Sequence, residues 1–385
     1  MKTEAVYNNN PYLKRVKGKI IDIRYRENME VLFDKTIFYP EGGGQPSDRG
    51  YIERDQKRFL ITNVQEEGEI WHTVEEGEKL EVGMEVEEVL DWDRRFRNMQ
   101  AHSAEHIFSG LLAKYHNANN IGFYISEKYF TCDYDIPLGK EKIREIEILA
   151  NKIIQKNIPI DSYYPPEEEL DTLDYRSKKE IQGRIRITRI PEVDNCACCG
   201  THVGYSGEIG YMKLITVEKY KKGIRCTIKA GMPAVEHSIE AFSIIEEIGR
   251  KHSCSMEDII GRLEKAEKEQ NKLVEEIKAL KKEKIRSLIE KIDSQKEIFL
   301  EEDLGIEDGR DLANELLQKI ETVFLRLEKD QFLIASKEKQ AKEIFEEMKE
   351  FLRGGGSESM VQGKILSGKE ELEERFYSIL ERASL

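Results

Sequence analysis

Two short stretches of this sequence carry side chains that can bind a metal ion. One holds His102 and His106, and the other holds Cys198 and His202, so the members of each pair are four positions apart. Imidazole and thiolate are ligands that Zn²⁺ prefers, and pairs far apart in the chain close a four-ligand site only when the protein folds around it. We therefore expect a zinc ion bound by these four residues, in a zinc-dependent hydrolase.

The first pair is predicted to lie on a helix. Apolar residues recur at helical intervals between residues 93 and 112, and on a helix the positions i and i+4 share one face. Metalloproteases place glutamate directly after the first histidine. Here Glu105 stands directly before the second histidine, His106, which argues against a protease. The plainer interpretation is a surface or core histidine pair without a metal.

The second pair is predicted to lie on a loop, because Gly200 and two further glycines follow within a few residues. Three cysteines, Cys196, Cys198 and Cys199, crowd this loop. Cys198 is the preferred ligand because its spacing to His202 repeats that of the first pair, and Cys196 is the substitute. A zinc knot with a purely structural role is the alternative interpretation of this loop.

Composition limits the class of protein. The chain has 385 residues, so we expect more than one domain, and its net charge of −14 argues against non-specific coating of nucleic acid, although a local basic groove is compatible with it. No apolar run approaches the length of a membrane span, and the amino-terminal segment lacks the apolar core of a signal peptide. The six cysteines suit metal binding in a reducing compartment. We expect a cytoplasmic protein without a membrane partner.

The pattern of elements predicts an α+β fold in four parts. These are a small antiparallel β-barrel at 1–92, a zinc-binding α+β domain at 93–232, a helical coiled-coil arm at 233–295 and a small α/β domain at 296–385. The arm is predicted from a 4-3 spacing of apolar residues, and one long solvated helix is the alternative. A homodimer through the arm or the last domain is the expected assembly.

Two runs of three glycines interrupt this pattern. Gly42–Gly44 lie within the segment 36–50, and because each glycine costs backbone entropy on ordering, we interpret them as a loop that another chain segment or a substrate approaches closely. A plain wide turn is the alternative. The second run, Gly354, Gly355 and Gly356, follows a predicted helix, which indicates helix termination and a mobile loop, or else backbone approach to phosphate.

Four motifs occur in one order: Thr36–Gly50, Arg95–His106, Cys198–Val203 and Gly223–Gly231. Together they resemble the alanyl-tRNA editing family, the free-standing relatives of the editing domain of alanyl-tRNA synthetase, over roughly residues 15 to 235. The segment from Gly354 to Gly363 is similar to the glycine loop of the DHHA1-type domain that ends the synthetase. The chain therefore resembles the long, free-standing form of the editing protein.

The resemblance implies a deacylase that hydrolyses the ester of mischarged tRNA(Ala) carrying serine, or glycine. It implies the same four zinc ligands, and it matches Gln45 to the glutamine of the family's glycine loop. Thr36 matches a threonine near the amino-acid pocket, and a group there that hydrogen-bonds the serine hydroxyl would discriminate against alanine. An ordinary strand threonine is the alternative. The sequence departs from the family pattern at Glu105 and in the additional thiols beside Cys198.

The predicted zinc site leaves two ways for a water molecule to reach the metal ion. Four protein ligands fill a tetrahedral zinc site, so a water would enter as a fifth ligand or one of the four would be loose. The acceptor stem and its phosphates are predicted to contact Arg94, Arg95, Arg97 and Lys213, together with the glycines Gly354, Gly355 and Gly356. The competing functions are a zinc-stabilised RNA-binding protein without catalysis and an unrelated zinc hydrolase that acts on small molecules.

Overall fold

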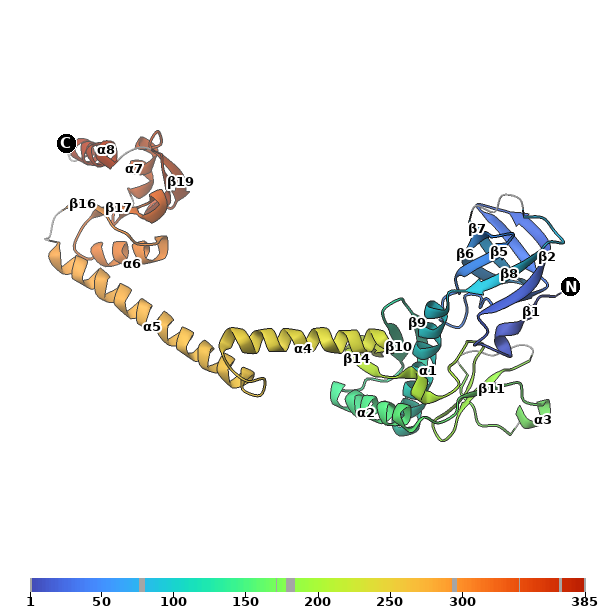
Figure 1. The fold of residues 1–385 in the computed structure, drawn as a ribbon. Helices are drawn as coiled ribbons and strands as arrows, with labels where there is room; N and C mark the ends of the chain where they lie inside the picture. The colour runs from blue at the N-terminus through green and yellow to red at the C-terminus, as the bar shows by residue number, and fades with distance from the viewer. Residues whose placement is uncertain are drawn as a thin grey trace. The chain divides into compact units, whose positions relative to one another are not determined.

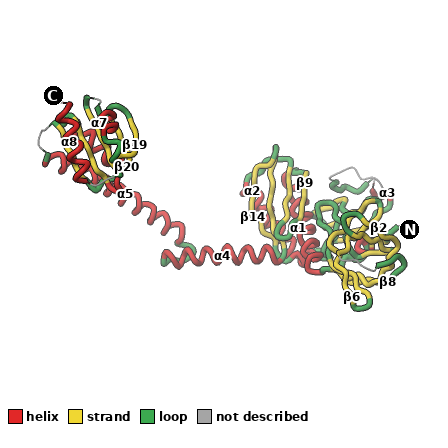
Figure 2. Tube along the Cα trace, turned by 90° about the horizontal axis from the view of Figure 1, so that it is seen from above, coloured by secondary structure: helices red, strands yellow, loops and turns green. Residues whose placement is uncertain are grey.

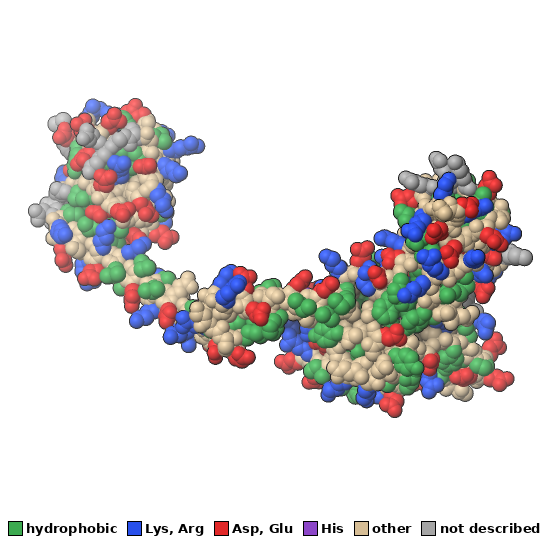
Figure 3. Space-filling view, viewed as in Figure 1, with side chains coloured by type: hydrophobic (Ala, Val, Ile, Leu, Met, Phe, Trp, Pro, Cys, Tyr) green, Lys and Arg blue, Asp and Glu red, His purple; other side chains and the backbone are tan. Residues whose placement is uncertain are grey.

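A computed structural model describes residues 2–75, 80–170, 172–177, 184–292, 296–338, 340–366 and 369–383. The chain forms two compact units, residues 1–248 and 249–385, which we call unit 1 and unit 2 (Figure 1). Both units mix helices and strands, which confirms the expected α+β class. Over the described residues, no helix combines the length and the apolar character that crossing a bilayer requires. Acidic and basic side chains alternate on the face drawn in Figure 3.

A closed barrel of six antiparallel strands opens unit 1 and confirms the expected small β-barrel. Its strand order is β2-β3-β7-β6-β5-β8, and its interior is filled by branched and aromatic side chains such as Ile20, Val31 and Phe33, all 0% exposed. A short parallel pair, β1 (Glu4–Ala5) and β4 (Lys35–Thr36), flanks the turn η1 (Val6–Asn8). The barrel strands are β2 (Arg15–Tyr25), β3 (Met29–Phe33), β5 (Gly50–Arg54), β6 (Lys57–Glu67), β7 (Glu69–Glu75) and β8 (Glu85–Leu90).

The second part of unit 1 is built around the helix α1 (Trp92–His116). Asp91 caps its first turn by accepting a hydrogen bond from the backbone N–H of Arg94 at 3.1 Å, and Asn117 ends it in the left-handed conformation with φ of 53°. Most of the helix is buried, against the second helix α2 (Lys140–Lys156) on one side and strands on the other. The predicted helix at residues 93–112 is therefore confirmed.

Two small sheets complete this part. The antiparallel order β14-β15-β10-β9 forms one, drawn as adjacent yellow strands in Figure 2, and β11-β12-β13 forms the other. In the first sheet, β9 and β10 form an antiparallel hairpin. The elements are β9 (Asn120–Ile125), β10 (Phe130–Tyr134), β11 (Asp161–Tyr163), α3 (Glu167–Leu170), β12 (Ile187–Ile190), β13 (Asp194–Ala197), η2 (Ser206–Ile209), β14 (Met212–Tyr220) and β15 (Gly223–Ala230).

Two long helices follow, as predicted for the arm: α4 (Met232–His252) and α5 (Ile259–Lys291). Along the middle of α5 three apolar positions of the 4-3 pattern are exposed, with 58% of Leu273, 53% of Ile277 and 64% of Leu280 accessible to solvent, whereas Ile259 at the start of the helix is buried. The helical character of this region is confirmed. Pairing of these positions in a coiled coil stays a prediction.

Unit 2 contains a mixed five-stranded sheet in the order β16-β17-β18-β20-β19. The expectation of a helix end and a mobile loop at the second run of glycines is wrong, because Gly354, Gly355 and Gly356 belong to β19 and pair with β20. A side chain at Gly354 would collide with the backbone of β20, so close strand approach explains the glycine. The elements are β16 (Glu297–Glu301), α6 (Ile306–Leu316), β17 (Thr322–Leu327), η3 (Glu328–Asp330), β18 (Gln331–Ser336), α7 (Ala341–Glu347), β19 (Leu352–Gly356), β20 (Met360–Ile365) and α8 (Lys369–Ala383).

Candidate metal centre

The fold brings together the four side chains that the sequence predicts as zinc ligands. One nitrogen of each of His102, His106 and His202 and the sulfur of Cys198 all lie within 4.8 Å of one another. Sγ of Cys198 is 3.4 Å from Nε2 of His102 and 3.4 Å from Nε2 of His202. Ligand atoms at the corners of a tetrahedral zinc site are about 3.5 Å apart, given Zn–N and Zn–S bond lengths of about 2.0 and 2.3 Å. The spacing of this cluster therefore fits a zinc ion.

The choice among the three cysteines follows from the same geometry. Cys199 is exposed, and Cys196 is buried in a different group with His106 and Asp194. Of these three thiols only Cys198 shares the four-residue cluster, although it lies within two positions of both others in sequence. The loop after β13 turns its sulfur towards α1.

Gly200 makes this close approach of the loop possible. A Cβ atom at this position would collide with the imidazole of His102, so any side chain would push the loop away from α1. The sequence predicts a turn at this glycine, but its φ is not positive. Close packing on His102 is the reason for the glycine.

Each of the three imidazoles is held by an oxygen atom on its Nδ1 side. This contact fixes the orientation of the ring and leaves Nε2 to face the cluster, as is usual for histidines that bind metals. The three pairs are His102 with Oε1 of Gln45 at 2.9 Å, His106 with Oδ2 of Asp194 at 2.9 Å, and His202 with Oγ of Ser103 at 3.2 Å.

Asp194 is itself held by a partly buried arginine, Arg176. The guanidinium of Arg176 donates to both carboxylate oxygens, with Nε to Oδ1 at 2.7 Å and Nη2 to Oδ2 at 2.8 Å. Burial raises the pKa of Asp194, but His106 and Arg176 outweigh burial and hold that pKa below its usual value. Asp194 is therefore an anion that accepts from His106. Sequence reasoning missed Asp194, Arg176 and Ser103, although Asp194 stands four positions before Cys198.

The electrostatics at Cys198 and His202 favour the forms that bind metal. At His106 burial lowers the pKa, but the thiols of Cys196 and Cys198 and the carboxylate of Asp194 outweigh burial and hold that pKa well above its usual value. Burial raises the pKa of the Cys198 thiol, but the neighbouring histidines, His102 first, outweigh it and hold that pKa well below its usual value. Burial, followed by the proximity of His102, lowers the pKa of His202 to about 3. A thiolate and a neutral imidazole are the states in which these side chains coordinate zinc.

Gln45 connects the glycine loop to the cluster. Its Oε1 contacts His102 as described, and its Nε2 donates to Oγ1 of Thr201 at 2.9 Å. The loop also docks on β9, where the carbonyl of Gly44 accepts from the backbone N–H of Ile125 at 2.9 Å. Gly44 has a φ of 85°, and a side chain there would collide with Phe123. The segment that approaches these glycines closely is thus the protein's own β9.

Thr36 lies in the buried core next to the barrel and is 0% exposed. Its hydroxyl oxygen is 3.0 Å from Oε2 of Glu88 and 2.8 Å from Nε2 of His72, both fully buried as well. Burial raises the pKa of Glu88 to about 8 and lowers the pKa of His72 to about 3. These contacts tie Thr36 to barrel residues rather than to the four-residue cluster.

The predicted nucleic-acid contacts separate into two groups. Arg95 is 0% exposed and donates to both carboxylate oxygens of Asp48 and to the carbonyls of Pro11 and Ile37. The expected phosphate contact of Arg95 is therefore wrong, because the whole guanidinium is buried in protein contacts. The ion pair of Arg95 and Asp48 instead joins α1 to the segment 36–50, which carries Gly42–Gly44.

The other cations are accessible to different degrees. Arg97 is exposed on α1, and Arg94 donates from Nε to the carbonyl of Ser47 at 3.1 Å. Nζ of Lys213 donates to Oε1 of Glu147 at 2.9 Å, which attaches β14 to α2. The contact with RNA stays a prediction for Arg94, Arg97 and Lys213, and likewise for the glycines of β19.

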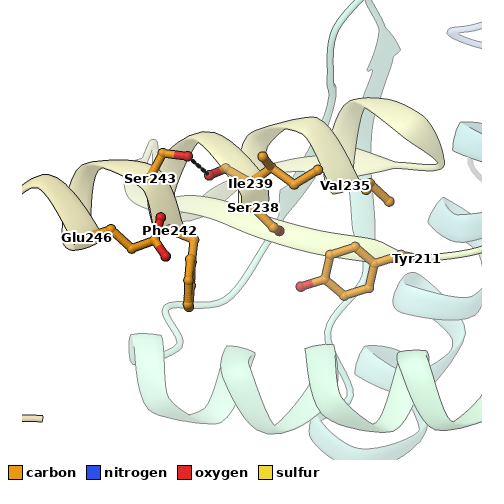
Figure 4. A pocket seen from close by; sticks show the side chains of 7 residues that line it. All are labelled: Tyr211, Val235, Ser238, Ile239, Phe242, Ser243 and Glu246. Atoms are coloured by element: carbon orange, nitrogen blue, oxygen red, sulfur yellow. Dashed lines mark hydrogen bonds between the residues drawn. The ribbon is translucent and has the colours of Figure 1, made fainter. Parts of the chain in front are cut away.

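An apolar pocket of about 450 Å³ lies elsewhere in unit 1, between Tyr211 and one face of α4 (Figure 4). Phe242 and Ile239 line it, and Glu246 is its acidic member. None of the four clustered residues belongs to it. This pocket therefore does not coincide with the candidate metal centre.

Comparison with known proteins places the chain in a family. Residues 9–94 match the family of class II (A) tRNA synthetases, and residues 185–225 match the second additional domain of threonyl and alanyl tRNA synthetases. The alanyl-tRNA editing protein AlaX-L of Pyrococcus horikoshii is 29% identical over 96% of each chain. The alanine–tRNA ligase of Staphylothermus marinus is 35% identical over 58% of this chain, which spans 25% of the ligase. The alanyl-tRNA editing protein AlaX-M of Saccharolobus solfataricus is 35% identical and is covered over 95% of its length, so this chain belongs to the alanyl-tRNA editing protein family.

Proposed function

We propose that this protein is a trans-editing hydrolase that cleaves the aminoacyl ester of mischarged tRNA(Ala), with Ser-tRNA(Ala) and Gly-tRNA(Ala) as substrates. The observation that carries the proposal is the cluster of His102, His106, Cys198 and His202, whose ligand atoms lie within 4.8 Å of one another in a member of this family. We place the reaction in the cytoplasm, where charged tRNA is the partner.

The cluster is proposed to hold Zn²⁺. A zinc ion supplies, when bound, a Lewis acid that polarises an ester carbonyl and lowers the pKa of a water molecule. The chain's own contribution is orientation, since Gln45, Asp194 and Ser103 each fix one imidazole. Thr36 is retained as the proposed selectivity residue. Because its hydroxyl is buried between Glu88 and His72, this role requires the segment 36–39 to move when the aminoacyl group binds.

The test is deacylation of three purified esters, Ser-tRNA(Ala), Gly-tRNA(Ala) and Ala-tRNA(Ala), by the full chain. We expect loss of the seryl and glycyl esters and survival of the alanyl ester. His106→Ala should lose activity and zinc, whereas His116→Ala, at the exposed end of the same helix, should retain both. Survival of all three esters with the metal-loaded protein would contradict the proposal.

A second candidate is a zinc-stabilised RNA-binding protein without catalysis. It is favoured by one observation: four protein ligands already complete a tetrahedral shell, and the three histidines are at most 4% exposed, as in structural zinc sites. In that case His106→Ala would lower stability and zinc content, and all three esters would survive while tRNA still bound.

We also propose how the chain divides into domains and how it assembles. We retain divisions near residues 92, 232 and 295, and a homodimer through the exposed apolar positions of α5 or through the last domain at 296–385. Light scattering of the full chain should give twice the mass of 44.8 kDa. Replacing Leu273, Ile277 and Leu280 with lysine should give the monomer mass if α5 is the interface.

A further inference from the structure

A small pocket lies on the surface of unit 1, one helical turn along α1 from the candidate metal centre. It is a cavity of about 20 Å³ between α1, the turn that joins β9 to β10, and the start of α4. A cavity of this size admits about one oxygen-sized group. Asn98, which lines it, is four positions before His102 and so lies on the same face of α1, about 6 Å along the helix axis.

Asn98 is a buried donor that faces this cavity. The residue is 5% exposed, and its amide nitrogen has no hydrogen-bond partner within the parts of the chain that the structure describes. A buried amide that makes no hydrogen bond costs about 1–3 kcal/mol, so native proteins rarely leave one without a purpose. The cavity in front of Asn98 is therefore suited to a ligand oxygen that accepts from this nitrogen.

Positive charge surrounds the cavity. Arg97 and Lys128 line it with exposed side chains. Glu127, the acidic residue of the lining, lies 3.8 Å from Nη1 of Arg49 and 3.7 Å from Nη1 of Arg94, so two guanidinium groups share this one carboxylate. The neighbouring charge of Arg49 also acts with burial to lower the pKa of Arg94. The lining itself holds two cations, Arg97 and Lys128, against one carboxylate, Glu127, which Arg49 and Arg94 also approach, so the rim of the pocket carries a local excess of positive charge in a chain whose net charge is −14.

The pocket and the metal centre are joined by packed aromatic rings. The ring of Phe123 lies 5.0 Å from that of His102 and 6.2 Å from that of Phe130, which lines the pocket. Tyr129 lines the pocket too and is 43% exposed, so its ring is available to stack on a base. Amide donors, cations and an exposed aromatic ring are the groups that bind single-stranded RNA.

We propose that this pocket binds a backbone phosphate of the single-stranded 3′ end of tRNA, with one phosphate oxygen accepting from Asn98 and with Arg97 and Lys128 pairing with its charge. The proposal rests on the proposed function, because the ester that is cleaved sits at that 3′ end. In this proposal Asn98, Arg97 and Lys128 hold the 3′ end of the tRNA beside the metal centre. Of the cations predicted to contact phosphate, Arg97 is the one that we assign to this pocket. Arg95 is buried, and Lys213 pairs with Glu147.

The test measures the dissociation constant of uncharged tRNA(Ala) for the full chain as a function of salt. We expect the double variant Arg97→Gln/Lys128→Gln to weaken binding about tenfold or more at low salt, and to make the slope of log K against log salt shallower by about one to two. Lys142→Gln, an exposed cation on α2 outside the pocket, is the matched control and should bind like the wild-type protein. Unchanged affinity and slope in the double variant would overturn the proposal.

Asn98→Asp tests the pocket itself, because it keeps the shape of the side chain and replaces the donor with an anion that repels phosphate. We expect it to weaken binding of intact tRNA(Ala) but not of tRNA trimmed of its single-stranded 3′ nucleotides. Equal binding of intact tRNA by Asn98→Asp and wild type would mean that the cavity holds only water. Where Asn98→Asp does not fold, Asn98→Ser replaces it with the same expected direction. These measurements use uncharged tRNA, so they stand even if the wild-type protein cleaves no ester, which would instead contradict the proposed function.

Discussion

Oγ1 of Thr36 and Oε2 of Glu88 lie 3.0 Å apart in a core where neither residue is exposed. The protons of this contact can be assigned from its neighbours. Nδ1 of His72 is 3.2 Å from the carbonyl oxygen of Val31, which can only accept, so Nδ1 carries the proton of the neutral ring. Nε2 then accepts the single hydroxyl hydrogen of Thr36 at 2.8 Å. The contact between Thr36 and Glu88 therefore needs a proton on the carboxyl group.

We predict that Glu88 is protonated at neutral pH and that this makes stability depend on pH. Burial raises the pKa of Glu88 from 4.5 to about 8. Between these two pKa values the folded state binds a proton that the unfolded state has released. The contribution of Glu88 to the free energy of unfolding is therefore complete below pH 4.5 and is lost as the pH rises through about 8. Between these values the free energy of unfolding should fall by about 1 kcal/mol per pH unit because of this group.

Glu88→Gln mimics the protonated carboxyl and should remove this part of the pH dependence. Both tryptophans, Trp71 and Trp92, lie in unit 1, so denaturant unfolding followed by tryptophan fluorescence reports on that unit. The infrared C=O band of a neutral carboxyl group should also disappear in the variant. Parallel stability curves for the variant and the wild type across this pH range would show that Glu88 is ionised.

Asp194→Asn is predicted to weaken zinc binding by about 10–100-fold. The carboxylate orients His106 through Nδ1 and is held in turn by Arg176, and an amide at this position accepts more weakly from both. Zinc affinity is measured by competition with a chelator, and the cobalt-substituted protein gives a thiolate charge-transfer band that reports on Cys198. Asp161→Asn, an exposed carboxylate on β11, is the control. If both variants bound zinc as tightly as the wild type, the orienting role of Asp194 would be refuted.

Asp48→Asn is predicted to destabilise unit 1 by about 3–5 kcal/mol, because it leaves the buried guanidinium of Arg95 without its counter-charge. The same carboxylate accepts from the backbone N–H of Tyr39 at 2.6 Å, so the glycine loop should loosen as well. Glu87→Gln breaks the exposed pair with Arg15 and should cost less than about 1 kcal/mol. Tryptophan-detected unfolding compares the two variants, and equal small losses would contradict the structural role of Arg95.

The sequence predicts the clustering of the four candidate metal ligands because the placement within each pair depends on short-range geometry. His102 and His106 share a helix face by the period of the helix alone, and Cys198 and His202 lie on one short loop. Arg95 shows where this reasoning fails. A cation in a charged stretch looks like a surface residue, and nothing in that stretch reveals that Asp48, in a different part of the fold, neutralises it inside the protein. Asp194 fails for the same reason, since its partners become neighbours only through tertiary packing.

The glycines fail in a different way. The run Gly42–Gly44 correctly indicates close approach but does not say what approaches, and the run Gly354–Gly356 is not the helix end and mobile loop that the sequence predicts. At Gly44 the neighbour is β9, and at Gly354 it is the backbone of β20, so the expected loop after a helix is a strand. The local sequence shows that a glycine has no side chain, but it does not show which segment packs against that glycine.

Gly200→Ala is predicted to damage the metal centre more than any other single methyl group added to its loop. The new Cβ would collide with the His102 ring, whose Nδ1 is held by Gln45 and whose face packs on Phe123. The loop must then move and take Cys198 and His202 with it, so we expect at least a tenfold loss of zinc affinity. Gly204→Ala is the matched control, because a Cβ there meets its nearest neighbours at 3.5 Å, an ordinary contact, and neither glycine has a positive φ. Zinc competition on both variants decides the matter: similar affinities would show that the approach of residue 200 to His102 is not what holds the four ligands together.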